Sequence, residues 1–475
     1  MSSYNIKKIS LITQKILLIA SMATLIKNCC FRSFKSLPAE RFFTSCRLLS
    51  RKVNTSASPD SQTSQYINTI INPYTVETYA RPNVIITHGK GSYLYDLENQ
   101  EYIDFGAGIA VTCLGHADSK VTEIISQQAA SLMHCSNLYH NLPAGELVNK
   151  LVTKTIASKG MADAQRVYLC NSGTEANEAA MKFARKYGKS IDDQKCEFIT
   201  FENSFHGRTF GSLSVTPNAK YQDPFLPLVP GVKVAKVNDI SSVEKHIDKS
   251  KTCAVIIEPI QGEGGVNPVD TDFMIALKKL CVKNDVLLIF DEIQCGLGRT
   301  GNLWAHCEYP KEAHPDIVTM AKALGNGFPI GATMISEKVE KALKVGDHGT
   351  TYGGNPLGSK IGCHIVDQVS DKAFLDAVSM KSEKFIKGFT KIQKSFPDHI
   401  ILIKGKGLLL GVEFSSSLNV SDVVAKCRDN GLFVISAGMN TLRIVPALNI
   451  PNETIEEGLQ ILTDSIKEIV QTSKV

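Results

Sequence analysis

Short apolar runs alternate with longer helical stretches from about Lys120 onward. Five runs are apolar on both faces and end at polar or glycine-rich turns, which is typical of strands in a sheet covered on both sides. They are RVYLC (166–170), EFITF (197–201), AVIIE (254–258), VLLIF (286–290) and DIVTM (316–320). Because helical stretches separate the runs, most of the strands should be parallel. The pattern therefore predicts an α/β fold whose mixed, mainly parallel sheet is covered by helices.

The chain on either side of this region follows a different pattern. GSYLYDLENQEYIDF (91–105) predicts two strands around a polar turn. Beyond about Lys360 a helix precedes the runs LLLGVEF, LFVISAG and TLRIVPAL, and a last helix follows them. This is the pattern of a smaller α+β lobe, which we expect the early strands to join. The predicted divisions are a leader and linker (1–60), an N-terminal segment of the small domain (61–119), a large domain (120–359) and the remainder of the small domain (360–475).

The first 59 residues contain ten Lys and Arg side chains and one acid, Glu40. They open with an apolar stretch that can form a helix bearing Lys7, Lys8 and Lys15, which is typical of a mitochondrial presequence. Residues 16–26 would also serve as the apolar core of a secretory signal peptide. Basic residues continue as far as Lys52, however, and this favours import into the mitochondrial matrix. No later run is long and apolar enough to predict a membrane span.

Charge and cysteine content exclude several other classes of protein. The formal charge of the whole chain is +5, but the residues after the leader contain 42 basic and 46 acidic side chains, a net charge of −4. This balance gives no indication of a nucleic-acid partner. The 13 cysteines are scattered and never spaced as C-x-x-C, so neither a disulfide framework nor a zinc site is expected. His306, Cys307 and His314 match no familiar metal-site spacing, and no metal is expected.

Polar residues follow each of the five apolar runs. In open α/β sheets, ligands bind outside the carboxyl ends of the strands. The segments that we expect to meet there are Asn171–Thr174, Asn203–Arg208, Glu258–Glu263, Asp291–Gln294 and the residue Lys322. A small-molecule site at this edge of the sheet is therefore predicted.

The segment NSGTEANEAA (171–180) follows the first run. Ser172 and Glu175 have the spacing of a capping box, so a helix should begin near Gly173. The exposed amides and positive dipole end of that helix would bind an anion such as a phosphate. A well-capped helix with no ligand would leave the same pattern.

Asp291 ends a buried apolar run, where a carboxylate is costly unless a cation faces it. Lys322 also follows a buried run directly. An ion pair between the two residues would satisfy both, and so would a cofactor placed between them. Pyridoxal 5′-phosphate has an aldehyde that binds a lysine, a ring nitrogen that becomes cationic opposite a carboxylate, and a phosphate suited to a helix N-terminus. This cofactor would account for Asp291, Lys322 and the capped helix together.

Six motifs in the same order also resemble a known family. They are NSGTEANEAA, SFHGRT, EPIQGEGG, LIFDEIQCGLGRTG, AKALGNGFPIG and GTTYGGNP. Together they resemble the class III, or ω-, aminotransferases, which have the fold of type I enzymes dependent on pyridoxal phosphate. The resemblance extends over about residues 66–470, which is nearly all of the chain after the leader.

The resemblance implies roles for matching residues of this chain. Lys322 would form the Schiff base with the cofactor and then move the proton between substrate and cofactor. Asp291 would pair with the ring nitrogen, and Gln294 would bond the ring hydroxyl. The further cofactor contacts implied are Gly173 and Thr174 at the phosphate, Phe205 on the ring face, and Thr351 donated to the phosphate by a neighbouring subunit. A homodimer with shared active sites is therefore implied.

The same resemblance indicates the substrates, because arginine is the natural bidentate partner of a carboxylate. Arg443 would hold the α-carboxylate of glutamate or 2-oxoglutarate, and Glu263 would neutralise it when the other substrate is bound. Arg208, with Thr350 beside it, would bind the carboxylate of that other substrate. Ile109 stands where ornithine aminotransferases typically have a tyrosine that contacts a free α-amino group.

An apolar residue at that position suits a substrate whose α-amine is masked by an acyl group. The chain therefore resembles the branch of the family that converts N2-acetyl-L-ornithine and 2-oxoglutarate to N-acetyl-L-glutamate 5-semialdehyde and L-glutamate, a step of arginine biosynthesis. The alternatives left open are aminotransferases of ornithine, succinylornithine or 4-aminobutyrate. An aminomutase, which needs no 2-oxoglutarate, and a scaffold that has lost its chemistry are the more distant ones.

Overall fold

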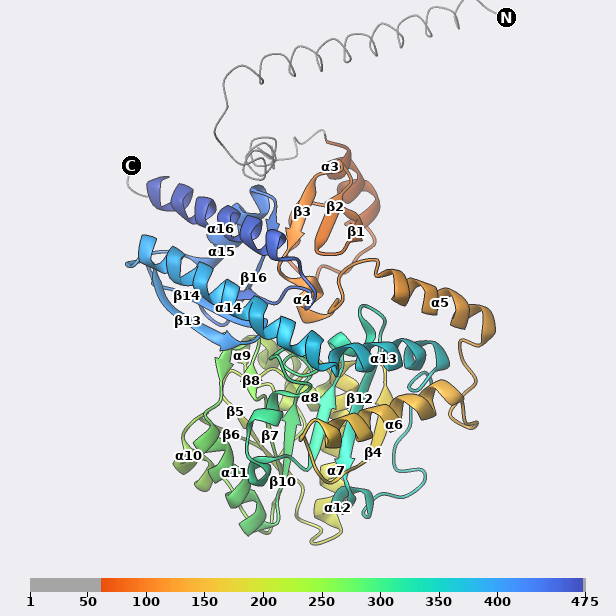
Figure 1. The fold of residues 1–475 in the computed structure, drawn as a ribbon. Helices are drawn as coiled ribbons and strands as arrows, with labels where there is room; N and C mark the ends of the chain where they lie inside the picture. Colours follow the sequence, from red (N-terminus) through yellow and green to blue (C-terminus); the bar gives the residue numbers. More distant parts are fainter. Residues whose placement is uncertain (1–60, 473–475) are drawn as a thin grey trace, which may run out of the picture. The chain divides into compact units, whose positions relative to one another are not determined.

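A seven-stranded sheet forms the centre of the computed structural model, which describes residues 61–472 (Figure 1). The predicted leader (1–60) lies outside the described residues. The sheet has the order β4-β12-β11-β10-β7-β5-β6, in which β12 is antiparallel to both neighbours and the other pairs are parallel. The strands are β4 (Ala164–Cys170), β5 (Glu197–Phe201), β6 (Val232–Ala235), β7 (Thr252–Ile257), β10 (Leu287–Asp291), β11 (Ile317–Met320) and β12 (Gly331–Ser336).

The five predicted apolar runs coincide with β4, β5, β7, β10 and β11. The predicted mixed, mainly parallel sheet is therefore confirmed, whereas β6 and β12 were not foreseen. Because β12 is antiparallel to both β4 and β11, these two outer neighbours run in the same direction. The carboxyl ends of all five predicted strands consequently lie at one edge of the sheet.

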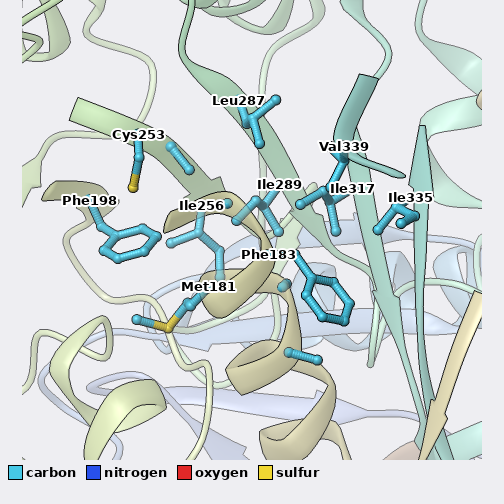
Figure 2. Close-up of a cluster of buried hydrophobic side chains, with 14 of the residues drawn as sticks. Met181, Phe183, Phe198, Cys253, Ile256, Leu287, Ile289, Ile317, Ile335 and Val339 are labelled. Carbon is cyan, nitrogen blue, oxygen red and sulfur yellow. The ribbon is translucent and has the colours of Figure 1, made fainter. Parts of the chain in front are cut away.

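Both faces of the sheet are buried, because successive residues of a strand point to opposite sides. Leu287 and Ile289 of β10 pack toward α7 (Gly173–Lys189), where they join Met181 and Phe183 (Figure 2). Leu288 and Phe290 of the same strand pack on the other side, in a cluster with residues of α11 (Thr271–Asn284). This two-sided burial explains why the strands read as continuous apolar runs rather than alternating ones.

Smaller sheets are formed by the two ends of the described chain. The predicted early hairpin is β2 (Tyr93–Asp96) and β3 (Glu101–Asp104), and β3 pairs in parallel with β15 (Leu432–Phe433), as expected for early strands that join the C-terminal lobe. The other strands are β1 (Ile86–Lys90), β8 (Ile260–Gln261), β9 (Asn267–Pro268), β13 (Ile400–Lys406), β14 (Leu409–Phe414), β16 (Ile435–Ala437) and β17 (Thr441–Ile444).

The longer helices besides α7 and α11 are α5 (Ser119–Ser131), α6 (Leu142–Ala157), α13 (Pro356–Val369), α14 (Lys372–Ser395), α15 (Val420–Asp429) and α16 (Asn452–Thr472). Short helical segments connect them, namely α3 (Gln62–Tyr66), η1 (Ile67–Ile71), α4 (Ala107–Ala110), α8 (Phe210–Ser214), α9 (Ala219–Gln222), η2 (Asp223–Phe225), α10 (Ile240–Glu244), η3 (Ala305–Glu308), η4 (Lys311–Ala313), η5 (Lys322–Gly325) and α12 (Glu337–Glu340). Within residues 61–472, no helix combines the length and apolar character that crossing a bilayer requires.

The short segment α4 is unusual in its backbone. All four residues have positive φ, at 46° for Ala107, 62° for Gly108, 66° for Ile109 and 62° for Ala110. It is thus a left-handed turn, a conformation that disfavours residues with a Cβ and especially β-branched ones. Ile109 is the most strained of the four by this criterion.

Candidate active site

The strand ends line a cavity of about 390 Å³ at the predicted edge of the sheet. Eight of the eleven predicted site residues line it: Gly173, Thr174, Phe205, Arg208, Glu263, Asp291, Gln294 and Lys322. A ninth, Arg443, contacts two of these lining residues. The expectation that the five strand-end segments meet is therefore confirmed.

Asp291 is the last residue of β10 and is only 4% exposed. Its Oδ2 accepts hydrogen bonds from Asn177 Nδ2 and His206 Nδ1, both at 2.8 Å, and its Oδ1 accepts one from Ile293 N at 3.1 Å. Three donors hold this carboxylate in place, as a buried acid requires. Its ionised form is thereby available to a cation in the cavity.

Lys322 begins η5, directly after the edge of β11, and has a φ of 34°. Among the described residues, its amine makes neither a hydrogen bond nor an ion pair, so the simple pairing of Lys322 with Asp291 is not what the structure contains. Removal from water lowers the pKa of this amine to about 8, and the positive charge of Arg443 acts in the same direction. A neutral, unpaired amine is well suited to react with an aldehyde.

The phosphate site predicted at the third group is the N-terminus of α7. Ser172 is the N-cap, and its hydroxyl accepts a hydrogen bond from Glu175 N at 3.3 Å, as the capping pattern predicts. The Glu175 carboxylate accepts from Asn171 N at 2.8 Å instead of completing the box at Ser172 N. A Cβ on Gly173 would lie 2.9 Å from Ile293, so only glycine leaves the first turn open here. Thr174 Oγ1 lies 2.6 Å from Ser212 Oγ, a second hydroxyl beside the helix terminus.

The donor set fits pyridoxal phosphate. An amine without a protein partner, an anchored carboxylate and a helix N-terminus with open backbone amides border the same cavity. These are the groups that an aldehyde, a protonated ring nitrogen and a phosphate need.

Arg443 lies on β17 and connects the other side of the site. Its Nη2 donates to Glu263 Oε2 at 2.8 Å, and its Nη1 donates to Gln294 Oε1 at 3.2 Å. The arginine is 2% exposed and its Nε has no hydrogen-bond partner among the described residues. The predicted contact between Glu263 and Arg443 is therefore present.

Arg208 is exposed and lies against two aromatic rings. Its guanidinium carbon is 3.7 Å from the ring centroid of Tyr221 and 5.6 Å from that of Phe205. Stacking of this kind holds a guanidinium plane without occupying its N–H donors. Arg208 is therefore oriented yet free to bind a carboxylate.

Three residues in the sequence predictions lie outside this cavity. Thr350 and Thr351 line a separate hollow of about 380 Å³, in which Asn171 Nδ2 donates to Thr350 Oγ1 at 3.3 Å. Ile109 is 44% exposed, and the lining residue from its segment is Val111. Within one chain, the structure thus brings neither Thr350 nor Ile109 together with Arg208.

Sequence reasoning assigned no role to three buried polar residues at the site. Asn177 and His206 hold Asp291, and Asn177 Oδ1 in turn accepts from Thr319 Oγ1 at 2.8 Å. Glu258 accepts hydrogen bonds from two loops. His206 and Glu258 stand in the motifs SFHGRT and EPIQGEGG, so their place at strand ends was the available signal.

A family model described as class-III aminotransferase matches residues 74–466, and the chain belongs to this family. Enzymes of this family depend on pyridoxal phosphate, which is therefore the cofactor of this chain, and their substrates are small molecules.

Particular relatives agree with this assignment. The mitochondrial acetylornithine aminotransferase of Debaryomyces hansenii is 72% identical over 436 residues, which covers 92% of this chain and 94% of the relative. A crystal structure of N-acetylornithine aminotransferase from Stenotrophomonas maltophilia is 34% identical, with a TM-score of 0.71, and covers 83% of this chain and 99% of that one. An ornithine aminotransferase from Toxoplasma gondii, reported with partial occupancy of pyridoxal phosphate at its active site, is 29% identical, with a TM-score of 0.80, over 93% and 100% of the two chains. The mitochondrial location predicted from the leader is confirmed by the first of these relatives and others like it.

Proposed function

We propose that this chain transfers the terminal amino group of N2-acetyl-L-ornithine to 2-oxoglutarate, giving N-acetyl-L-glutamate 5-semialdehyde and L-glutamate. The observation that carries this choice of substrate is the 72% identity with an acetylornithine aminotransferase across 92% of the chain. The reaction would serve arginine biosynthesis in the mitochondrial matrix.

A panel of amines tests the proposal. Purified enzyme is assayed with N2-acetyl-L-ornithine, N2-succinyl-L-ornithine, L-ornithine and 4-aminobutyrate, each with 2-oxoglutarate as the acceptor. We expect the highest kcat/KM with the acetylated amine. A higher value with free ornithine would assign the chain to the second candidate, which the similarity to the T. gondii ornithine aminotransferase favours. Turnover without any oxoacid would indicate an aminomutase.

Pyridoxal phosphate supplies an electron sink for the carbon that loses its proton. In our proposal Lys322 binds the cofactor aldehyde, and its Nζ later takes up and returns the substrate proton. The low pKa of this amine, about 8, supports the second role, because a base should have a pKa near the working pH.

The other cofactor contacts follow from the same assignment. Asp291, fixed by His206 and Asn177, would keep the ring nitrogen protonated. Gln294 would bond the ring hydroxyl and Phe205 would lie against the ring face. Gly173 and Thr174 would bind the phosphate at the start of α7, where the helix dipole favours an anion.

Two arginines would bind the substrates. Arg443 would hold the α-carboxylate of glutamate or 2-oxoglutarate, and the Glu263 ion pair would cover it when acetylornithine is present. Arg208, stacked on Tyr221, would hold the carboxylate of acetylornithine. Because the two carboxylates bind different arginines, one cavity can present either the α-amine of glutamate or the terminal amine of acetylornithine to Lys322.

We also propose a homodimer in which Thr351, with Thr350 beside it, completes the site of the neighbouring subunit. The two threonines lie outside the cavity of their own chain. Large apolar side chains are exposed nearby, including Leu138 at 87%, Tyr139, Leu142, Val345 and Tyr352. An exposed patch of this kind is typical of a subunit interface.

Two domains are proposed on the boundaries given above. The strands of the central sheet, β4 to β12, all fall within residues 120–359. The pairing of β3 with β15 supports the assignment of residues 61–119 and 360–475 to one small domain.

A further inference from the structure

Glu258 follows β7 at the cavity and is 5% exposed. Strands β7 and β10 are paired in register, with Ile257 opposite Phe290. The next residues along the two strands are Glu258 and Asp291, so two carboxylates end neighbouring strands inside the same buried site. Such a pair is costly and needs a specific role or strong compensation.

Both oxygens of Glu258 are used to hold backbone. Oε1 accepts a hydrogen bond from Phe205 N at 2.9 Å, and Oε2 accepts one from Gly262 N at 3.0 Å. The first amide belongs to the loop that bears Phe205, His206 and Arg208. The second belongs to the loop that bears Glu263. One side chain therefore connects two loops that are 57 residues apart in sequence at these contacts (205 and 262).

The second loop transmits this position to the substrate arginine. A Cβ on Gly262 would collide with Oε1 of Gln294, so the Gly262 backbone lies directly against the Gln294 amide. That same Oε1 accepts a hydrogen bond from Arg443, and the residue after Gly262 is the ion-pair partner of Arg443. A shift of Gly262 would therefore move Gln294, Glu263 and Arg443 together.

We propose that Glu258 is a positioning residue that sets the spacing between the cofactor-stacking loop at Phe205 and the carboxylate-binding group of Arg443, Glu263 and Gln294. This inference rests on the proposed amino-transfer reaction. Burial raises the pKa of Glu258 to about 7; the adjacent His206 opposes this rise and Asp291 adds to it. Its charge, when present, raises the pKa of Lys322, as do the charges of Asp291 and Glu263, whereas Arg443 lowers it.

The decisive variant is Glu258→Gln in the holoenzyme. The amide keeps the shape but turns one acceptor into a donor that faces a backbone N–H, and it removes the charge. The matched control is Glu202→Gln, because Glu202 is exposed and follows the neighbouring strand β5. Three quantities are measured: the rates of the two half-reactions, with L-glutamate and with N2-acetyl-L-ornithine; the pH midpoint of the cofactor absorbance change; and the thermal midpoint.

We expect Glu258→Gln to slow both half-reactions about tenfold or more, as the loss of a buried hydrogen bond predicts. The absorbance midpoint should move about half a pH unit or more toward acid, because a negative charge near Lys322 is lost. Glu202→Gln should match the wild type in all three. Unchanged rates and midpoint in folded Glu258→Gln would overturn the proposal, even if its thermal midpoint fell, since that pattern indicates a purely structural role.

Glu258→Asp decides the question if Glu258→Gln does not fold. Aspartate keeps the charge but is one methylene shorter, so it cannot reach both amides without moving a loop. We expect slower half-reactions with an unchanged absorbance midpoint, and wild-type rates would overturn the proposal. The glutamate half-reaction does not depend on the donor amine. Slow glutamate turnover in Glu258→Gln, together with a wild type inactive on acetylornithine, would therefore contradict the proposed substrate and leave the role of Glu258 standing.

Discussion

Arg443 and Glu263 form an ion pair of 2.8 Å in which the two partners differ in exposure. The arginine side chain is almost wholly buried, whereas the glutamate side chain is partly open to solvent. Glu263 is therefore the partner that can turn away when a substrate carboxylate arrives. The pair is a means of presenting either a charged or a neutralised wall to the cavity.

Glu263→Gln should separate the two substrates. Without the competing carboxylate, we expect the KM for 2-oxoglutarate to fall about threefold to tenfold, because Arg443 is a charge-assisted donor that is then free. The kcat/KM for N2-acetyl-L-ornithine should fall by a similar factor, since the arginine charge is left uncompensated. Steady-state kinetics with each substrate varied would measure both. Parallel changes in the two constants would contradict this account.

Asp291→Ala should keep the fold and lose nearly all turnover, by about a hundredfold to a thousandfold or more. The reason is that a neutral ring nitrogen is a poor electron sink. Asp291→Asn keeps the shape without the charge and should be impaired to a similar degree. Thermal unfolding establishes that each variant is folded, and single-turnover rates measure the effect. Rates near those of the wild type would remove the proposed role of this carboxylate.

The pKa of about 8 at Lys322 predicts how apoenzyme binds its cofactor. Only the neutral amine attacks an aldehyde, so the rate of covalent capture should rise with pH to a plateau with a midpoint near 8. Burial is the largest cause of the low pKa and Arg443 is the next, so Arg443→Gln should move the midpoint upward. The folded apoenzyme binds fewer protons here than the unfolded chain between about pH 8 and 10.5, so Lys322 should make apoenzyme stability rise with pH in that window, relative to Lys322→Met. A capture rate still rising above pH 10 would be inconsistent with this pKa.

Hybrid dimers test the proposed contribution of Thr351. Inactive Lys322→Ala subunits are mixed with Thr351→Ala subunits after reversible dissociation. If Thr351 serves the neighbouring site, each hybrid contains one site with both residues intact, and activity should exceed that of either parent. If Thr351 serves its own chain, no hybrid site is complete and activity stays at the average of the parents. Sedimentation would confirm that hybrids form.

Ile109→Tyr should raise the use of free ornithine relative to the acetylated amine, because a phenol can contact the free α-amino group. Ile109 has a φ of 66°, so replacing a β-branched residue should not itself destabilise the turn. Ile109→Leu is the control for this change in strain and should leave the ratio of the two kcat/KM values as it is. An unchanged ratio in Ile109→Tyr would remove the specificity argument at this position.

The sequence was most informative where one physical signal dominated. The five core strands were predictable because burial on both faces leaves uninterrupted apolar runs, and Asp291 and Lys322 stood out because charges rarely end such runs. Strand β12 begins with Gly331 and Ala332, and β6 is four residues long, so neither has a distinctive pattern. Glu258 also ends an apolar run, yet its two backbone contacts come from loops that only the folded chain brings together.

The antiparallel strand β12 fixes a length within the site. It lies between β4, which leads into the phosphate-binding helix, and β11, which leads to Lys322. Two strand spacings therefore separate the two anchors, about 10 Å in total. Main-chain hydrogen bonding sets this distance, so the reach demanded of a bound molecule is built into the sheet and surrounding loops can diverge without altering it.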